Sequence, residues 1–406
     1  MGEDMKTVEL QQVTSIIAGQ SPESLTYNST ADGLPFFQGK ADFQEKFPKV
    51  RVWCNSVKRK EAEPGDILMS VRAPVGSVNI CNQKCIIGRG LSAIRSHSNL
   101  NNYFLYYYLK CNEKKVASLG TGSTFQAITQ TTLKRLEIPL PPLDDQIRIA
   151  TLLSKVENLI SRRREQLKQL DELLKSVFLE MFGDPISNPK RFPVKLLSEF
   201  YIKPKNGTKC GPFGSALKKN ELVESGIPVW NMDNISPSGR MILPFRMWVT
   251  EEKFQELRSY SVIDGDIIIS RAGTVGKMCV AKMDCVPAII STNLIRVRLG
   301  SLLLPRHIIS LMTYCRGRVG RLKTGADGTF THMNTGILDK LEFPYPPLEL
   351  QRKFAEIFEK VESIKIQYQR SLFKMEHLYG TISQKAFKGA LDLSRVPVVE
   401  EGEPVI

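Results

Sequence analysis

Two stretches decide the fold because they repeat each other: residues 65–76 read GDILMSVRAPVG, and residues 265–276 read GDIIISRAGTVG. A second block also recurs, since the series that runs from Phe125 to Glu157 returns between Phe330 and Glu362. The offset is 200 positions in the first block and 205 in the second. Matching blocks in the same order predict a chain made of two copies of a unit of about 200 residues.

Each copy is predicted to contain a globular domain followed by a long helix. The first parts, residues 1–143 and 183–348, have the turn residues and short β-branched runs that are typical of strands. The second parts, residues 144–182 and 349–390, follow a Pro-Pro pair and contain no proline. Residues 391–406 are expected to form a flexible acidic tail. The expected fold class is α+β, with two globular domains of mixed α/β character, two long helices and an internal pseudo-two-fold repeat.

The two helical stretches carry an apolar stripe with a heptad repeat. A stripe held over about five heptads needs a partner helix, and the chain supplies one from its other half. We therefore expect an antiparallel intramolecular coiled coil, in which about 35 residues make a rod of roughly 50 Å. The residues expected to pair are Ile149, Leu152, Val156, Leu159, Leu170 and Val177 in the first stretch, and Phe354, Ile357, Val361, Ile364, Tyr368 and Met375 in the second.

The chain is basic, and its positive charge lies in the predicted globular domains. The 406 residues include 56 Lys and Arg and 42 Asp and Glu, which gives a net charge of +14 and a sequence pI near 9.3. Residues 1–143 carry +5 and residues 183–348 carry +9, whereas the helical stretches and the tail sum to zero. A rod with two basic ends suits double-stranded DNA, whose phosphates attract positive charge.

Several classes of protein find no support in the sequence. No apolar run approaches the roughly 18 residues of a membrane span, and the first 20 residues lack a signal pattern, so we expect a soluble, cytoplasmic chain without a membrane partner. The eight cysteines are dispersed and form no CxxC pair, which predicts free thiols and no metal site.

No catalytic residue and no cofactor are expected in this chain. Residues 271–278 resemble a phosphate-binding loop, but they lack its first Gly and have Met278 where Ser or Thr is required. The two Pro-Pro pairs have no Asn in front of them, unlike the catalytic turn of adenine methyltransferases.

Basic clusters in loop-like sequence are the candidate DNA contacts, and a merely solvated surface is the alternative interpretation. The turns at 120–125 and 324–330 recur in both copies, and they either approach a phosphate closely or form tight turns before a buried Phe. The candidates are Lys58, Arg59, Lys60, Arg72, Thr121, Ser123 and Thr124 in the first copy, and Lys203, Lys205, Lys209, Lys218, Lys219, Arg271, Lys277, Arg316, Arg318, Arg321, Lys323 and Thr329 in the second.

The repeated plan of a variable domain, Pro-Pro-Leu, Gln and a long helix resembles the specificity subunits of type I restriction-modification enzymes, the HsdS family. The resemblance covers about residues 6–390. It implies two target-recognition domains, each reading one half of a bipartite double-stranded DNA target, and spacer helices that act as ruler and dock. The residues that carry it are Pro141, Pro142, Leu143 and Gln146, Pro346, Pro347, Leu348 and Gln351, and the repeated stretch 65–76.

The resemblance also implies protein partners. These are two methyltransferase (M) subunits, which bind S-adenosylmethionine and methylate adenine, and restriction or motor (R) subunits.

Half-sites one helical turn apart are about 34 Å from centre to centre, within reach of such a rod. Residues 77–119 and 277–323 align poorly, which favours an asymmetric target.

Two other classes of function remain as alternatives. One is a coiled-coil scaffold or adaptor that holds protein partners instead of DNA. The other is a self-sufficient DNA-modifying enzyme, which the missing catalytic and cofactor motifs disfavour.

Overall fold

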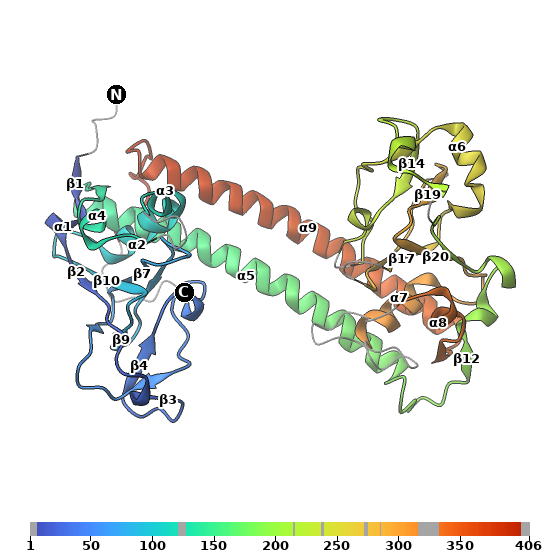
Figure 1. Cartoon of the computed structure of the whole chain (residues 1–406), viewed down its shortest axis with the longest axis horizontal. Coiled ribbons are helices and arrows are strands. Elements are labelled where there is room, and N and C mark those ends of the chain that lie inside the picture. The colour runs from blue at the N-terminus through green and yellow to red at the C-terminus, as the bar shows by residue number, and fades with distance from the viewer. Residues whose placement is uncertain are drawn as a thin grey trace. The chain divides into compact units, whose positions relative to one another are not determined.

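The chain folds into two compact units that repeat one α+β plan. Unit 1 combines Met1–Glu165 with Gln369–Ile406, and unit 2 is Gln166–Tyr368 (Figure 1). Each unit contains one globular domain and a part of both long helices, so the α+β prediction with an internal repeat is confirmed. The computed structural model describes residues 6–120, 127–213, 216–236, 239–271, 275–284, 286–315 and 333–398.

The domain of unit 1 is built on two sheets. Its elements are β1 (Thr7–Glu9), α1 (Leu10–Val13), β2 (Thr14–Ala18), β3 (Tyr27–Asn28), β4 (Leu34–Phe37), β5 (Trp53–Cys54), β6 (Glu61–Ala62), β7 (Ile67–Ser70), β8 (Val78–Ile80), β9 (Cys85–Ile87), β10 (Leu91–Ser96), α2 (Asn102–Cys111), α3 (Glu113–Ser118), α4 (Gln130–Lys134) and β11 (Glu137–Pro139). One sheet has the order β2-β10-β7-β8 and the other the order β3-β5-β4-β9-β6, in which β4 and β9 are parallel. A separate β1–β11 pair ties the start of the domain to its end.

The domain of unit 2 repeats this topology. Its elements are β12 (Val194–Leu196), β13 (Thr208–Cys210), β14 (Ile227–Trp230), β15 (Trp248–Val249), α6 (Glu251–Glu256), β16 (Ser261–Val262), β17 (Ile267–Ser270), β18 (Met278–Val280), β19 (Ala288–Ile290), β20 (Leu294–Val297), α7 (Pro305–Tyr314), α8 (Thr335–Asp339) and β21 (Glu342–Pro344). Its sheets have the orders β13-β20-β17-β18 and β15-β14-β19-β16, with β14 and β19 parallel, and β12 pairs with β21.

The two long helices are α5 (Leu143–Phe182) and α9 (Leu348–Ala386), and they are antiparallel within each unit. In unit 1, Ile149 near the start of α5 shares a core with Ile382 near the end of α9. In unit 2, the rings of Phe178 and Phe354 lie 5.2 Å apart between their centroids. The prediction of two long antiparallel helices is therefore confirmed.

The residues buried along these helices differ in part from those expected to pair. Leu159 and Ile364 are 53% and 39% exposed, so their assignment to a buried seam is wrong. The helices pack on the domain cores, and such packing buries residues three and four apart, including Leu153 and Ile160, instead of a strict heptad seam. Of the other expected residues, Ile149, Val156, Phe354 and Val361 are buried, and Leu152, Leu170, Val177, Ile357, Tyr368 and Met375 are half-buried.

The repeated glutamine clamps each domain to its helix. The Oε1 atom of Gln146 accepts the backbone N–H of Asn101 at 2.8 Å, and its Nε2 donates to the carbonyl of Pro141 at 2.8 Å. Gln351 makes the same two contacts in unit 2, with the N–H of Leu304 at 2.9 Å and the carbonyl of Pro346 at 3.0 Å. Both amides are buried. The Pro-Pro-Leu and Gln motif is therefore a structural joint, which explains why it recurs.

The chain after α9 returns to the core of unit 1. The ring of Phe387 lies 5.6 Å from that of Phe104 and 5.4 Å from that of Tyr108, both on α2. Leu391 and Leu393 also pack against this core. The chain is thus anchored beyond residue 391, where the sequence analysis placed the start of a flexible tail.

A histidine is buried among aromatic rings in the core of unit 2. The ring of His307 on α7 lies 4.6 Å from that of Phe182 and 5.6 Å from that of Phe178. Neither ring nitrogen has a hydrogen-bond partner among the described residues. Burial disfavours the charged imidazolium and lowers the pKa of His307 to about 3.

Acid is expected to destabilise unit 2 through His307. The pKa of His307 is about 3 in the folded state and near 6.5 in the unfolded state, so between these values the unfolded chain binds a proton that the folded chain does not. The free energy of unfolding is therefore unaffected by this group above pH 6.5. It decreases as the pH falls from 6.5 toward 3, by up to about 1.4 kcal/mol per pH unit. The variant His307→Phe should lose less free energy of unfolding over this range. Urea unfolding at pH 7, 6, 5 and 4 measures the difference, and parallel decreases in both proteins would contradict the assignment.

Candidate nucleic-acid interface

The repeated Gly-Asp motif builds the domain frame. Gly65 and Gly265 have φ values of +91° and +86°, a conformation that favours glycine, and each precedes a buried aspartate. Asp66 accepts two hydrogen bonds from Arg95, both at 2.8 Å. Asp266 accepts two from Arg298, both at 2.7 Å. This motif joins β7 to β10 and β17 to the residue after β20, so it is structural.

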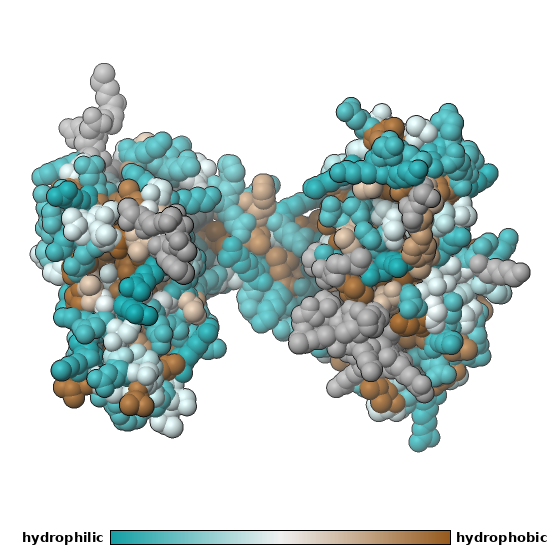
Figure 2. Space-filling model, viewed as in Figure 1, coloured by the Kyte–Doolittle hydropathy of each residue, from teal (hydrophilic) through white to brown (hydrophobic). Residues whose placement is uncertain are grey.

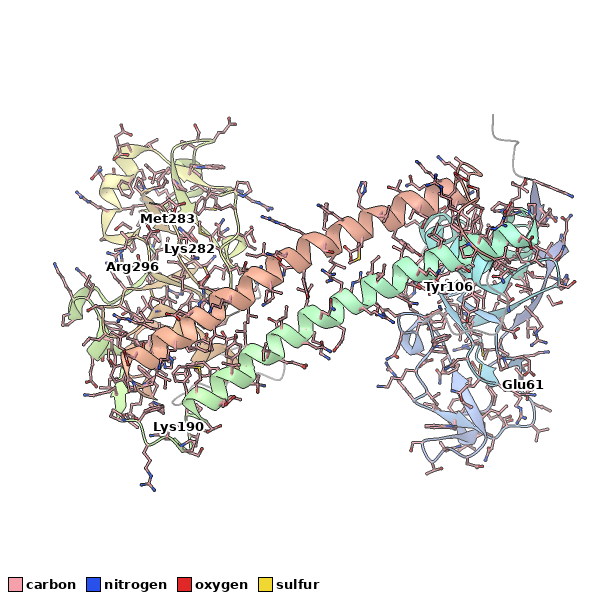
Figure 3. All side chains as sticks on the ribbon, turned by 180° about the vertical axis from the view of Figure 1, so that it is seen from behind. Glu61, Tyr106, Lys190, Lys282, Met283 and Arg296 are labelled. Carbon is pink, nitrogen blue, oxygen red and sulfur yellow. The ribbon has the colours of Figure 1, made fainter. Side chains whose placement is uncertain are left out.

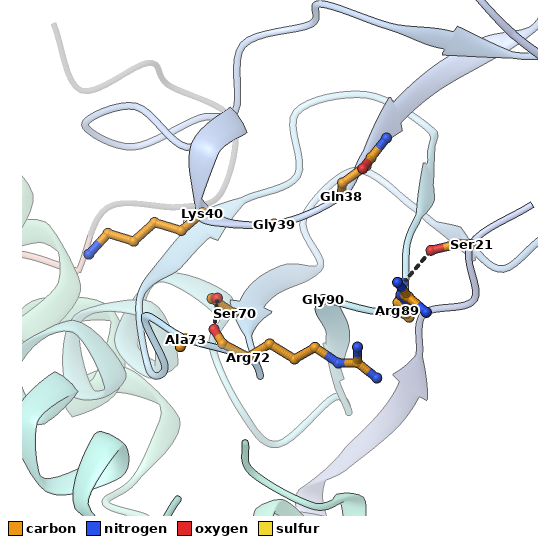
Figure 4. A pocket seen from close by; sticks show the side chains of 9 residues that line it. All are labelled: Ser21, Gln38, Gly39, Lys40, Ser70, Arg72, Ala73, Arg89 and Gly90. Carbon is orange, nitrogen blue, oxygen red and sulfur yellow. Dashed lines mark hydrogen bonds between the residues drawn. The ribbon is translucent and has the colours of Figure 1, made fainter. Parts of the chain in front are cut away.

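A basic pocket of about 200 Å³ lies in unit 1 where the loops after β4, β7 and β9 converge. Arg72 and Arg89 are both exposed and line it, together with Lys40. Figure 4 shows the Arg72 side chain running toward the side on which Arg89 lies, while Lys40 points to the opposite side. The lining residues are Ser21, Gln38, Gly39, Lys40, Ser70, Arg72, Ala73, Arg89 and Gly90.

The predicted cluster at residues 58–60 lies next to β6, whose first residue Glu61 is labelled in Figure 3. Arg59 is engaged within the domain, since its Nε donates to the Glu61 carboxylate at 2.7 Å. Lys58 and Lys60 are exposed, and neither has an ion pair within the described part of the chain. Two of these three residues therefore present their charge to solvent.

The unit 2 candidates lie on several loops and strand ends. Lys203, Lys218 and Lys219 are exposed. Lys209 is held over the ring of Tyr260 at 4.8 Å, and Arg271 over the ring of Phe213 at 4.7 Å. Lys277 is half-buried after the β17 strand, and Lys205 lies in a short 3-10 helix. Thr121, Ser123, Thr124, Arg316, Arg318, Arg321, Lys323 and Thr329 lie outside the described residues.

Three residues were not among the candidates predicted from the sequence: Lys40 and Arg89 at the pocket of unit 1, and Phe213 beside Arg271 in unit 2. Arg89 stands between Gly88 and Gly90 in the turn from β9 to β10. An arginine between two glycines in a short connection between strands was a usable signal, because such connections lie at the surface. Phe213 gave no such signal, since its contact with Arg271 joins residues 58 positions apart.

The described residues contain no group of His, Cys, Asp and Glu that could hold a metal ion. The cysteines in the described part of the chain are free thiols. None of the helices described is both long enough and apolar enough to cross a membrane.

The fold and the basic loop ends define a duplicated α+β binding module carried on a pair of long helices. The chain matches the family model of the type I restriction modification DNA specificity domain over residues 2–170 and again over 213–372. It therefore belongs to the family of type I restriction-modification specificity subunits.

Individual relatives agree with this assignment. The chain is 42% identical over 178 residues to the putative type I restriction enzyme MjaX specificity subunit of Methanocaldococcus jannaschii, a match that spans 43% of this chain and 42% of that protein. It is 21% identical to the MjaVIII specificity subunit of the same organism, over 89% of this chain and 87% of the relative. The crystal structure of the S subunit of the type I system from M. genitalium has a TM-score of 0.58 at 18% identity, with 95% of this chain and 96% of that chain covered.

Proposed function

We propose that this chain selects the DNA sequence for a type I restriction-modification enzyme and is not itself catalytic. The observation that carries the proposal is that the family domain occurs twice on one backbone plan, with different side chains at the loop ends. Each unit then reads one half of a bipartite, asymmetric double-stranded DNA target. The net charge of +14 supports a polyanionic partner.

In this proposal the long helices set the distance between the half-sites. The 40 residues of α5 correspond to a helix about 60 Å long. Half-sites separated by one turn of DNA are about 34 Å apart, which is within that length. Both helices contribute to both units, which supports a role in spacing.

The helices also dock two adenine methyltransferase subunits, which bind S-adenosylmethionine, and through them the motor-nuclease subunits. Support comes from apolar side chains that the helices leave at the surface, where Figure 2 shows hydrophobic residues among hydrophilic ones. A soluble protein gains by covering such side chains with a partner. The residues are Leu159, Leu173, Phe373 and Leu378.

The proposal is tested by mapping methylated adenine in the DNA of cells with and without this gene. We expect a two-part motif with a fixed gap to lose its methylation when the gene is deleted. Complementation with the wild-type gene should restore it. Unchanged methylation, although the gene and its methyltransferase partner are expressed, would contradict the proposal and favour a scaffold that holds only proteins.

A further inference from the structure

The unit 1 pocket presents hydrogen-bond donors of one charge sign. Its lining includes Arg72 and Arg89 and contains no Asp or Glu. Lys40 also lines it, but its Nζ points to the opposite side and lies 3.5 Å from Oε1 of Glu113. Two arginines that line one pocket repel each other unless an electronegative group lies between them. A guanidinium carries only donors, in a planar fork that matches two adjacent acceptors. The pocket therefore suits a ligand edge with acceptors.

The backbone around both arginines is fixed, whereas their side chains are exposed. The N–H of Arg89 donates to Ser21 Oγ at 3.3 Å, and the carbonyl of Arg72 accepts from Ser70 Oγ at 3.0 Å. The N–H of Val71 donates to the carbonyl of Gly90 at 2.9 Å, which ties the two loops together. Such a frame fixes the backbone from which both side chains extend, so binding need not order these loops.

Unit 2 has the same frame without these arginines. In unit 1 the backbone N–H of Gly88 donates to the carbonyl of Phe37 at 2.8 Å, and in unit 2 that of Ser291 donates to the carbonyl of Trp230 at 2.9 Å. Ser291 is therefore the equivalent of Gly88, and Thr292, the next residue, is the equivalent of Arg89. The constant offset of 200 in this block makes Ala272 the sequence equivalent of Arg72. Neither replacement carries a charge.

The same region of unit 2 uses another arginine and an aromatic ring. The backbone N–H of Arg271 donates to the carbonyl of Asn293 at 3.0 Å, as the backbone N–H of Val71 donates to the carbonyl of Gly90 in unit 1. Arg271 therefore takes the place of Val71. Its guanidinium lies over Phe213, 4.7 Å from the ring centroid. One backbone frame therefore carries different donors in the two units. The DNA phosphates are chemically the same in both half-sites, whereas the base edges differ. Different donors in the two units therefore favour contacts with bases over contacts with phosphates.

We propose that Arg72 and Arg89 read a guanine in the half-site bound by unit 1, an inference that rests on the proposed function. Guanine presents N7 and O6 as two acceptors in the major groove, and this pair is the usual partner of an arginine fork. Adenine and cytosine each place an amino donor there, which would face the arginine donors without a partner. The pocket therefore selects guanine over adenine and cytosine.

The test maps methylated adenine in cells that express Arg72→Ala or Arg89→Ala together with the methyltransferase partner. We expect methylation of the original motif to fall about 10–100-fold, with one guanine position of one half-site relaxed and the other half-site unchanged. Arg89→Lys should rescue only in part, because an ammonium lacks the planar fork. Arg135→Ala, at an exposed arginine of the same domain, should leave the motif unchanged.

Other results would overturn the inference. A uniform loss of methylation with an unchanged motif, rescued by Arg89→Lys, would show a phosphate contact instead. An unchanged motif with unchanged efficiency would place the pocket outside the DNA interface. A motif that contains no guanine would contradict the assignment of guanine to this pocket. Urea unfolding of each variant, with a midpoint equal to that of the wild type, excludes a folding defect. Failure of the proposed function is distinct, because gene deletion would then leave the wild-type methylation unchanged.

Discussion

Replacing Phe354 with alanine is expected to reduce the free energy of unfolding of unit 2 by about 3–5 kcal/mol, the usual cost of removing a fully buried aromatic ring. The Phe354 ring is fully buried and lies 5.2 Å from Phe178 and 5.6 Å from Phe182, between ring centroids. It therefore joins the start of α9 to the end of α5. Urea unfolding, with hydrogen exchange read separately for peptides of unit 2, measures the loss.

The matched control is Phe373→Ala on the same helix. Phe373 is 71% exposed, so its removal should change the stability of the isolated chain by less than about 0.5 kcal/mol. Equal effects of the two substitutions would contradict the packing of α9 on α5 in unit 2.

Replacing Asp266 with alanine is expected to cost about 3–5 kcal/mol, because it leaves the half-buried Arg298, beside the buried Arg296, without its carboxylate. Asp266 is 1% exposed and accepts two hydrogen bonds from Arg298 and one from the backbone N–H of Ile263. Arg296 is buried nearby on β20 (Figure 3), and its pKa is lowered by burial and, to a smaller extent, by the charge of Arg298. Thermal and urea unfolding of the full chain measure the effect.

The repeat supplies the control for this variant. Asp66→Ala removes the equivalent carboxylate in unit 1, but the Arg95 side chain is 43% exposed, whereas that of Arg298 is 18% exposed. Water can solvate Arg95, and Ala93 stands where unit 2 has Arg296, so we expect a smaller loss of about 1–2 kcal/mol. A larger loss for Asp66→Ala than for Asp266→Ala would refute this account of the ion pairs.

Much of the architecture was predictable because it rests on repeated local patterns. The two stretches 65–76 and 265–276 gave the duplication, and the absence of proline after each Pro-Pro pair gave the long helices. The role of the repeated Asp was not predictable, since its arginine partner lies 29 residues away in unit 1 and 32 in unit 2. The seam was wrong at Leu159 and Ile364 because heptad arithmetic describes helix pairs, whereas these helices also pack on domain cores.

The candidate interface was less predictable than the fold. Charge and loop-like sequence selected Arg72 in unit 1 and Arg271 in unit 2, although Arg271 takes the place of Val71 in the repeated frame and not that of Arg72. They also selected Arg59, which an ion pair to Glu61 engages within its own domain. The pocket that Arg72 and Arg89 share and the contact of Phe213 with Arg271 depend on tertiary structure, which sequence spacing does not encode.

The most direct test of the account is the dependence of DNA binding on the gap between the half-sites. Once the methylated motif is known, the complex of this chain with its methyltransferase subunits is titrated with duplexes whose gap is one base pair longer. That insertion shifts one half-site by about 3.4 Å and rotates it by about 35°. If two units on a fixed spacer read two half-sites, the affinity should fall to that of DNA without a site. An affinity that is unchanged by the insertion would contradict the account.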